Sequence, residues 1–564
     1  MSQPRETDDR ILASSASGMT FLIIVQIASR LFTFIANQLI LRTLSPAILG
    51  IGTQLELYFI SILYFSRESI RTAIQRQPFH GASATTTHDG SHHQISDELN
   101  QKAQLQTISS QSVVNMSYLS ISMGIPSALI FATLYTQFAS QEVSETPFYL
   151  AGVAITTVAS LMELCVEPFF AVVQHYTLYK KRAIVETAAA FMKSLTVCGL
   201  FSWSSWKGRD LGVLPFALGY LCYSLSLICG YYLAIPKLTS RWRFSLLLTK
   251  IRPSDKSIYL ADRFPKYLVA LSTNVFFQSI VKHLLTQGDA MMLAAMTSLK
   301  DQGIYSLASN YGGLVARVLF QPIEENSRAV FSSLLNSGKQ HTSNVSAARA
   351  HLTEILRIYA MLAVFIFPLG PYLVPRILSL LGGHRWASPE VGSLLSLYCY
   401  YIPFLAFNGI TEAFVSSAAS ASDLRRQTYW MGVFSASFAL AAYLFLKIGG
   451  LGAHGLIWVN IINMTVRTAW SFIFLRSYFY LHGSSLALSE FCLRPQTWIA
   501  GALSSIILAR QGHDDTVYRS SVKALIFCTG YSLLIILLER KYLATRYAYI
   551  HRIIKSRSAR IKTE

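Results

Sequence analysis

Five basic side chains lie inside stretches of this chain that otherwise have the composition of membrane-spanning segments. They are Arg30, Lys193, Lys282, Arg317 and Arg467. A charged side chain at the bilayer centre costs about 2.5–3.5 kcal/mol, so five facing lipid would cost on the order of 12–17 kcal/mol, more than most folds can spare. We therefore expect these side chains to line an internal cavity or to find partners inside the protein. A cationic cavity would suit the passage of an anionic group.

The elements that must position these residues are membrane helices. Of the 564 residues, 52% are hydrophobic and only 14% charged, whereas soluble proteins carry about a quarter charged residues. Apolar runs long enough to cross a bilayer recur along the chain, and spanning segments in lipid must satisfy their own backbone, as helices do. We predict an all-α polytopic membrane protein with about 14 transmembrane helices. The predicted spans are 14–41, 47–66, 112–137, 147–174, 183–203, 211–236, 267–296, 303–322, 352–375, 391–418, 427–446, 452–475, 497–509 and 524–539.

The distribution of positive charge predicts the orientation of these spans. The amino terminus, the even-numbered loops and the tail hold 33 Lys and Arg residues, and the odd-numbered loops hold 10. The positive-inside rule therefore places both termini in the cytosol. The two densest basic stretches, 237–266 and 540–562, flank membrane helices, so we attribute them to topology and to contact with anionic membrane lipids, and we expect no nucleic-acid partner.

A faint internal repeat predicts how the spans are grouped. Gln26-x3-Arg30 recurs as Gln278-x3-Lys282, and Gly50-Ile51-x-Thr53-x4-Tyr58 recurs 253 residues later as Gly303-Ile304-x-Ser306-x4-Tyr311. Six spans separate the copies, as in a parallel repeat about an axis along the membrane normal. We expect two six-helix lobes around a central cavity plus two extra C-terminal helices. The predicted parts are an N-terminal lobe 1–236 with a cytosolic loop 78–110, a basic linker 237–266, a C-terminal lobe 267–475, two additional helices 476–541 and a basic tail 542–564.

Motifs spread over residues 15–540 carry a family resemblance. They are Arg30-Leu31-x-Thr33-Phe34-x2-Asn37-x3-Leu41-Arg42, Ser66-Arg67-Glu68-x2-Arg71, Glu163-x3-Glu167-Pro168-Phe169, Glu186 with Lys193-Ser194, Lys282 with Leu285-Thr286-x-Gly288, Asp301-Gln302-Gly303-x-Tyr305, Leu314-Val315-Ala316-Arg317-x2-Phe320-Gln321-Pro322-Ile323-Glu324-Glu325 and Asn408-Gly409-x-Thr411-Glu412. The chain resembles the eukaryotic Rft family of endoplasmic reticulum proteins, within the multidrug, oligosaccharidyl-lipid and polysaccharide exporter superfamily. It departs from the family in Ser69, where Ala is expected, in a longer 78–110 loop and in its tail.

The resemblance implies a function and a substrate. It implies translocation of a dolichol diphosphate oligosaccharide with five mannoses and two N-acetylglucosamines from the cytosolic to the luminal leaflet, for protein N-glycosylation. Three alternatives stay open: a non-transporting scaffold that partners other proteins of this pathway, a cation-coupled small-molecule exporter, and a dolichol-dependent glycosyltransferase. The first predicted loop, near residues 42–46, is too short for the acid-bearing luminal loop of such transferases, so we expect no enzyme.

The basic residues suggest how a diphosphate would be held. We predict that Arg30, Lys282 and Arg317 bind the diphosphate and that Arg42 and Arg67 lie at the cavity mouths, since guanidinium groups suit phosphate geometry. The alternative is that each cation pairs structurally with an intramembrane acid. Candidate acids are Glu56, Glu163, Glu167, Asp289 and Glu412.

Other polar residues have less specific predicted roles. Glu163 and Glu167 lie four residues apart and could hold a coupling cation, but we favour neutralisation of Lys193 or Arg317; Glu412 is a further candidate for charge balance or coupling. Glu324 and Glu325 are expected to cap and pair at a helix end. Amides that could bind sugar hydroxyls or neighbouring helices are Asn37, Asn274, Gln278, Asn310 and Asn408.

Two features predict what the protein lacks. No GxxxxGK[ST] motif occurs, so we expect no ATP coupling. We also expect no cofactor, and no metal, because the histidines of the 78–110 loop have no ordered spacing or acidic partners. The sequons at Asn115, Asn344 and Asn463 lie in predicted cytosolic segments or inside a span, so we expect none to be glycosylated.

Overall fold

The structure is a computed structural model. It describes residues 44–75, 92–176, 178–234, 244–251, 259–335, 342–382, 386, 388–510 and 517–544. The first predicted span, 14–41, therefore lies outside the described residues. Apart from one short hairpin, β1 (Tyr259–Leu260) and β2 (Phe264–Pro265), the regular elements among these residues are helices.

Each predicted span from the second onward coincides with a helix or with consecutive helices. The helices up to the middle of the chain are α2 (Pro46–Gln75), α3 (His92–Gln137), α4 (Gln141–Ser144), α5 (Tyr149–Leu164), α6 (Glu167–His175), α7 (Tyr179–Lys207), α8 (Leu214–Ala234) and α10 (Lys266–Met296). Pro168 lies in the first turn of α6. Proline is tolerated there because the first N–H groups of a helix have no partner within the helix, so the N–H that proline lacks is not needed. Together α5 and α6 form one span with a local break.

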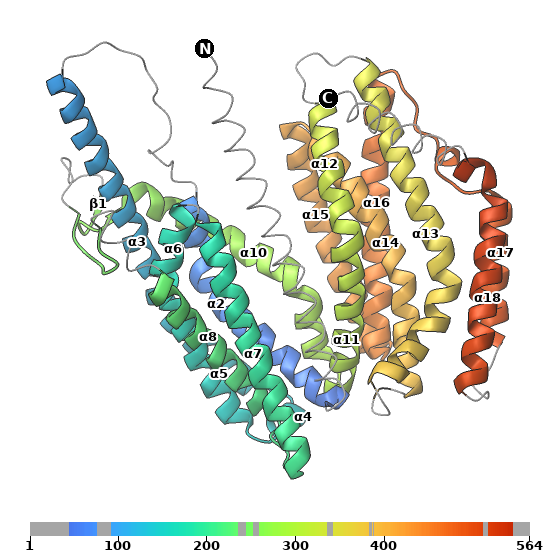
Figure 1. The fold of residues 1–564 in the computed structure, drawn as a ribbon, viewed down its shortest axis with the longest axis horizontal. Coiled ribbons are helices and arrows are strands. Elements are labelled where there is room, and N and C mark those ends of the chain that lie inside the picture. Colours follow the sequence, from blue (N-terminus) through green and yellow to red (C-terminus); the bar gives the residue numbers. More distant parts are fainter. Residues whose placement is uncertain are drawn as a thin grey trace, which may run out of the picture. The chain divides into compact units, whose positions relative to one another are not determined.

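The later helices follow the predicted spans as closely. They are α11 (Leu299–Val315), the π-helical segment η2 (Ala316–Phe320), α12 (Gln321–Leu335), α13 (Thr342–Gly382), α14 (Pro389–Ala418), α15 (Ala421–Ala442) with η4 (Tyr443–Ile448), α16 (Gly452–Leu481), α17 (Pro495–Arg510) and α18 (Val517–Leu538). Figure 1 shows them running side by side as long rods.

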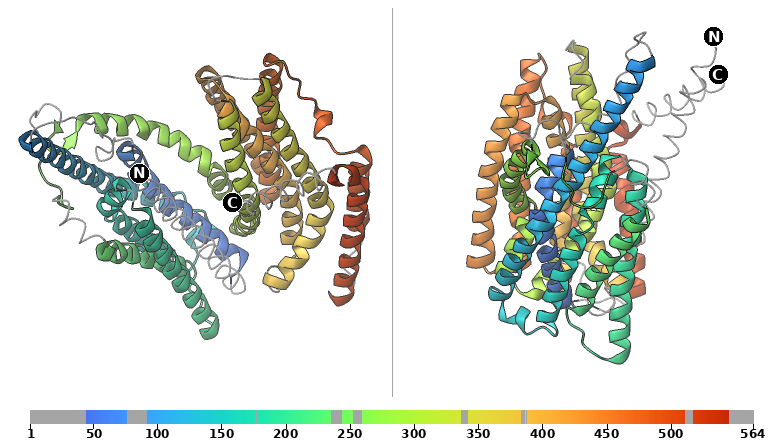
Figure 2. Two further views of the ribbon diagram at one scale, coloured as in Figure 1. Left: turned by 45° about the horizontal axis from the view of Figure 1, so that its top comes forward. Right: turned by 90° about the vertical axis from the view of Figure 1, so that its left-hand side faces the viewer.

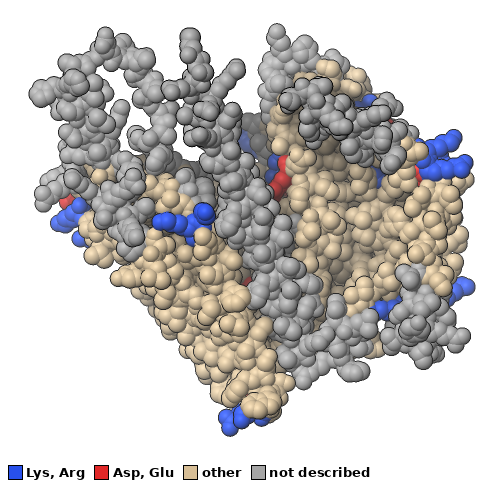
Figure 3. All heavy atoms as spheres, viewed as in Figure 1, with Lys and Arg blue, Asp and Glu red and all other residues tan. Residues whose placement is uncertain are grey.

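Length and hydropathy identify eight helices of the described residues as able to cross a membrane. A ninth is obtained if α10, which bends by 53° near Leu284, counts as one span. The count of about 14 stays a prediction, because the first span is not described and segments such as α17 are shorter than a bilayer requires. On the face drawn in Figure 3, the described Lys and Arg side chains gather toward the helix ends, as expected for spans with polar flanks.

The chain divides into two compact units, residues 1–303 and 304–564. In the first unit, α10 packs along α2. Ser61 on α2 lies 2.9 Å from Nε2 of the buried His283 on α10. Gln54 on α2 also donates a hydrogen bond to Gln302 (2.7 Å) at the start of α11. By packing, α10 therefore belongs with the first unit, whereas the repeat places it at the start of the C-terminal lobe. The two-lobe division remains a prediction about topology.

The basic linker is held to α3 by two amide side chains. Asn115 donates to the carbonyls of Thr249 (2.8 Å) and Arg263 (2.9 Å) and accepts from the N–H of Thr249 (3.2 Å). Gln111 bonds the backbone at Ser245 and Leu247. The described parts of the linker are thus a strap on α3 that leads into α10.

The last two helices pack on α13, as the red pair beside α13 in Figures 1 and 2 shows. Glu539, 1% exposed, joins three elements at one end of this pair. It accepts hydrogen bonds from the Arg494 N–H (3.1 Å), the Thr497 hydroxyl (2.9 Å) and Arg357 on α13 (3.2 Å). Apolar side chains including Val364, Tyr531 and Ile535 form the contact below it.

Candidate functional site

An ion network occupies one end of the first unit. Arg67 on α2 donates to Glu163 (2.7 Å) and to Glu167 (3.3 Å), and Arg71 binds both oxygens of Glu167 in a fork. The side chains of Glu163 and Glu167 are only 6% and 2% exposed. Among the described side chains, this acid pair binds Arg67 and Arg71 and not Lys193, whereas the side chain of Arg317 lies outside what the structure describes. The reason is packing: α2 lies directly against α5 and α6.

The network continues through an aromatic ring. The guanidinium of Arg71 lies 3.6 Å from the ring centre of Phe170, and that of Arg182 lies 4.7 Å from the same ring. Arg182 in turn pairs with Glu186 at 2.9 Å. Three cations and three acids thus neutralise one another and tie α2, α6 and α7 together.

Lys193 lies over an aromatic ring and not beside a described carboxylate. Its ammonium lies 4.0 Å from the ring centre of Tyr220 on α8, and within the described residues it has no carboxylate closer than 4 Å. A cation over an aromatic face is stabilised without full neutralisation. Oε2 of Glu163 is buried without a hydrogen bond.

Lys282 is the most accessible of the predicted diphosphate ligands that the structure describes. It lies on α10 with its side chain 66% exposed and contacts Glu68 at 3.2 Å. Gln278, one turn earlier, is also exposed. An ion pair this exposed contributes at most about 1 kcal/mol, so Lys282 can exchange Glu68 for another anion.

The remaining basic candidates divide between paired and undescribed residues. Arg467 on α16 donates to Glu412 on α14 (2.8 Å), and Asn408 donates to the same oxygen (3.2 Å). The backbone at Arg317 lies in η2, a π-helical segment of the kind often found at functional sites, which hydropathy does not reveal. Its side chain, like Arg30, Asn37 and Arg42, lies outside what the structure describes.

Two other predictions can be placed. Asn310 is exposed on α11. Glu325 accepts a hydrogen bond from Gln321 (2.9 Å), whereas Glu324, in the first turn of α12, forms no ion pair with any described residue. The described residues include no cluster of three His, Cys, Asp or Glu side chains that could hold a metal ion.

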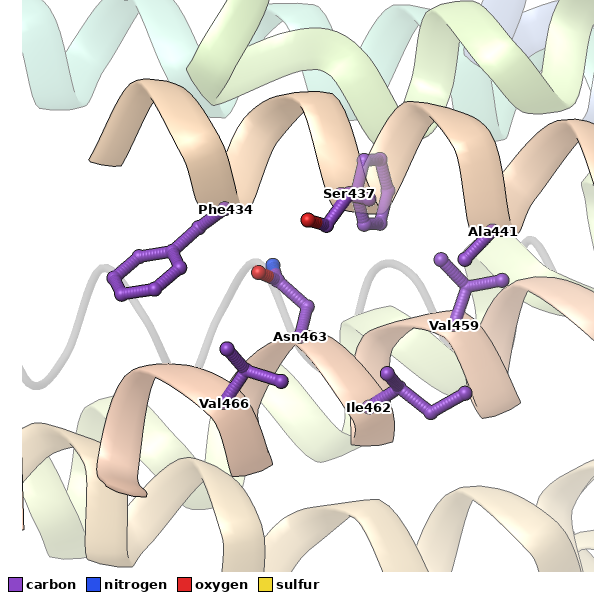
Figure 4. Close-up of a pocket in the computed structure, with 8 residues that line it drawn as sticks. Phe434, Ser437, Ala441, Val459, Ile462, Asn463 and Val466 are labelled. Atoms are coloured by element: carbon purple, nitrogen blue, oxygen red, sulfur yellow. The ribbon is translucent and has the colours of Figure 1, made fainter. Parts of the chain in front are cut away.

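A small groove lies between α15 and α16. Its cavity volume is about 20 Å³, and it is lined by apolar side chains with two polar ones, Ser437 and Asn463, which point into the space between the helices in Figure 4. A cavity of this size has room for about one water molecule. This groove therefore cannot hold an oligosaccharide diphosphate.

The fold defines the class of protein. The chain is similar to a lipid II flippase, MurJ, in an inward closed conformation (TM-score 0.60, 13% identity, 93% of this chain and 100% of that one). It is also similar to an inward-facing multidrug resistance MATE family transporter of the MOP superfamily (TM-score 0.52, 13% identity, 82% and 98%). This is an all-α polytopic membrane protein with a transporter fold.

The family follows from the sequence comparisons. The model of the Rft protein family matches residues 14–548. Proteins named Man(5)GlcNAc(2)-PP-dolichol translocation protein RFT1 are 33% identical in Yarrowia lipolytica (91% of this chain, 77% of that one), 33% in Candida glabrata (98% and 99%) and 32% in Saccharomyces cerevisiae (85% and 85%). The chain belongs to the Rft family.

Proposed function

We propose that this protein moves a dolichol diphosphate oligosaccharide of the Man5GlcNAc2 type between the leaflets of the endoplasmic reticulum membrane. Relatives similar over most of this chain carry the name of that translocation. The similar MurJ structure is that of a lipid II flippase. The proposed direction is cytosol to lumen, and the proposed orientation has both termini in the cytosol.

The observation that carries this proposal is the state of Lys282. It is a cation within a predicted span whose ammonium is exposed and whose partner, Glu68, is itself 32% exposed. Charge-assisted hydrogen bonds to phosphate are stronger than such a pair. A diphosphate can therefore replace Glu68 at Lys282, with Arg30 and Arg317 as the further proposed ligands.

Arg67 supports the proposal in a different way. Its two carboxylate partners are buried, which favours a structural, charge-balancing role for the Arg67 guanidinium over a ligand-binding role. Both roles were open from the sequence. Release of Arg67 toward a substrate would strand Glu163 and Glu167 without a counter-charge, which is costly at low dielectric. We therefore assign diphosphate binding to Lys282 before Arg67.

The polyprenyl tail is too apolar for a polar cavity, so in this proposal it stays in the bilayer while the head group crosses. The protein acts without catalysis, as expected for relatives named as translocation proteins. Its proposed partners are the lipid-linked oligosaccharide, membrane lipids and other proteins of the N-glycosylation pathway.

Reconstitution in liposomes with a labelled heptasaccharide diphosphate lipid tests the proposal. The native chain should exchange the lipid between leaflets, and Lys282→Ala should slow exchange about tenfold or more, since a bond to a charged group contributes about 1.5–3 kcal/mol. Lys282→Arg should retain exchange. Lys266→Ala, an exposed lysine at the start of the same helix, is the matched control.

The scaffold alternative has its own signature in this experiment. If the native chain binds the lipid but never exchanges it, the scaffold function is favoured and translocation by this chain alone is rejected. Exchange that is normal in Lys282→Ala would remove Lys282 from the site while leaving translocation intact.

A further inference from the structure

The two compact units contain polar clusters of similar construction. In the first unit, Glu163 and Glu167 are four residues apart and face α2. In the second unit, Asn408 and Glu412 on α14 have the same spacing, and α14 packs along α12. Residues four apart share one face of a helix, so each pair meets a neighbouring helix.

The neighbouring helices carry opposite charges at repeat-related positions. The 253-residue offset that relates Gly50 to Gly303 carries Arg71 onto Glu324. Arg71 neutralises Glu167 in the first unit. The second unit therefore carries an acid, Glu324, at the position where the first unit carries a base, Arg71.

Glu324 is held against the backbone of α14. A methyl group added at Gly409 would collide with the Glu324 carboxylate, so the absence of a side chain there is what makes room for it. No ion pair or hydrogen bond links Glu324 to another described side chain. The charged groups that act on it are Arg328 one turn further along α12, Glu412 on α14 and the adjacent Glu325.

Two buried polar atoms near Glu324 have no partner. Oδ1 of Asn408 accepts no hydrogen bond, and this residue is only 6% exposed. The hydroxyl of Tyr359 on α13 makes none either, and Tyr359 is 2% exposed. The Tyr359 ring packs against Phe320, one turn before Glu324, and against Phe407, next to Asn408. A buried polar atom without a partner is costly, and a bound water or ion is one way to satisfy it.

Arg467 on α16, the cation bound to Glu412, does not fill this gap. The guanidinium of Arg467 and the amide nitrogen of Asn408 both donate to Oε2 of Glu412. These bonds go to Glu412, at 2.8 and 3.2 Å, while Glu324 and Oδ1 of Asn408 receive no hydrogen bond from a described residue. The cluster keeps a surplus of oxygen acceptors and of negative charge.

We propose that Glu324, Asn408 and Tyr359 bind a small monovalent cation, with Glu412 at the edge of the site. An alkali ion or a proton would satisfy both the carboxylate and the orphan amide oxygen. The ligand set consists of oxygens, as hard cations prefer, but it contains too few anionic groups for a divalent ion that takes six or more oxygen ligands. In the first unit, the corresponding pair Glu163 and Glu167 is instead neutralised by Arg67 and Arg71.

Thermal unfolding of the full chain in detergent, at one ionic strength in sodium, potassium or choline chloride and from weakly acidic to neutral pH, tests this site. The native midpoint should rise saturably with the bound cation, because a ligand of the folded state stabilises it. In Glu324→Gln and Asn408→Leu the half-saturating concentration should increase about tenfold to hundredfold. Glu325→Gln makes the same charge change at the exposed neighbouring residue, which offers no ligand to the site, and should shift the half-saturating concentration far less.

The possible outcomes separate the occupants. A sodium or potassium response that Glu324→Gln abolishes identifies an alkali ion, and a response to pH alone that the same variant abolishes identifies a proton. Equal midpoints of the native chain in all three salts and at every pH would overturn the proposal and leave water as the occupant. So would a cation response that Glu324→Gln retains unchanged. None of these readouts depends on lipid translocation.

Discussion

Gly50 and Gly303 pack against each other with no side chain between them. A methyl group at Gly50 would collide with the carbonyl of Leu299, and one at Gly303 would collide with the carbonyl of Pro46. The 253-residue offset of the sequence repeat relates Gly50 to Gly303 and Pro46 to Leu299. The contact is therefore reciprocal: within the first unit, the first turns of α2 and α11 meet through atoms at repeat-related positions.

This contact predicts the effect of adding one methyl group. Gly303→Ala should lower the thermal midpoint markedly, because the colliding atoms are backbone atoms that cannot turn aside. Gly288→Ala is the matched control: nothing lies within 4 Å of the added methyl group, and alanine favours a helix over glycine by roughly 0.5–1 kcal/mol. An equal response of both variants would contradict the close approach.

The ion network predicts a large cost for removing one member. Arg67→Ala should destabilise the protein by about 3–5 kcal/mol, because it leaves Glu163 and Glu167 buried with less counter-charge. Arg182→Ala removes an arginine whose ion pair with Glu186 is about a third exposed and should cost far less. Thermal or denaturant unfolding in detergent measures both. A mild effect of Arg67→Ala would return Arg67 to the set of available diphosphate ligands.

The pair of Lys282 and Glu68 predicts a gain of function. Glu68→Gln removes the competitor for the Lys282 ammonium and should tighten binding of the diphosphate lipid several-fold, with a change in stability of no more than about 1 kcal/mol. Binding can be followed with the labelled lipid in micelles. Glu325→Gln, a similarly exposed acid on another helix, should leave affinity unchanged. Weaker binding by Glu68→Gln would mean that Glu68 positions Lys282 for the phosphate.

The strap on α3 predicts that the Asn115 sequon stays unmodified. Asn115 is fully buried, and both polar atoms of its amide are bonded to the linker or to Gln111. The purified native chain should therefore show no glycosidase-sensitive mass shift at this site. Asn115→Leu should cost about 1–3 kcal/mol or more through the linker groups left unpaired, and hydrogen exchange should rise at residues 244–251. Protection that is unchanged there would contradict the strap.

Helix positions could be read from the sequence because their cause is local. A segment in lipid must pair its own backbone groups, so an apolar run of sufficient length becomes a helix wherever it occurs. The predicted span 391–418 became α14 over Pro389–Ala418, and 183–203 became the middle of α7. The presence of buried charge inside the spans followed from the same hydropathy argument.

Partner choice could not be read in this way, because it depends on which helices touch. Glu163 and Glu167 neutralise Arg67 and Arg71 since α2 packs against α5 and α6, whereas Lys193 turns to an aromatic ring on α8. Spacing along the chain gave the shared face of the acid pair but not the helix opposite it. The isolation of Glu324 beneath Gly409 likewise arises from the approach of α12 to α14, a contact between residues more than 80 positions apart that no local pattern encodes.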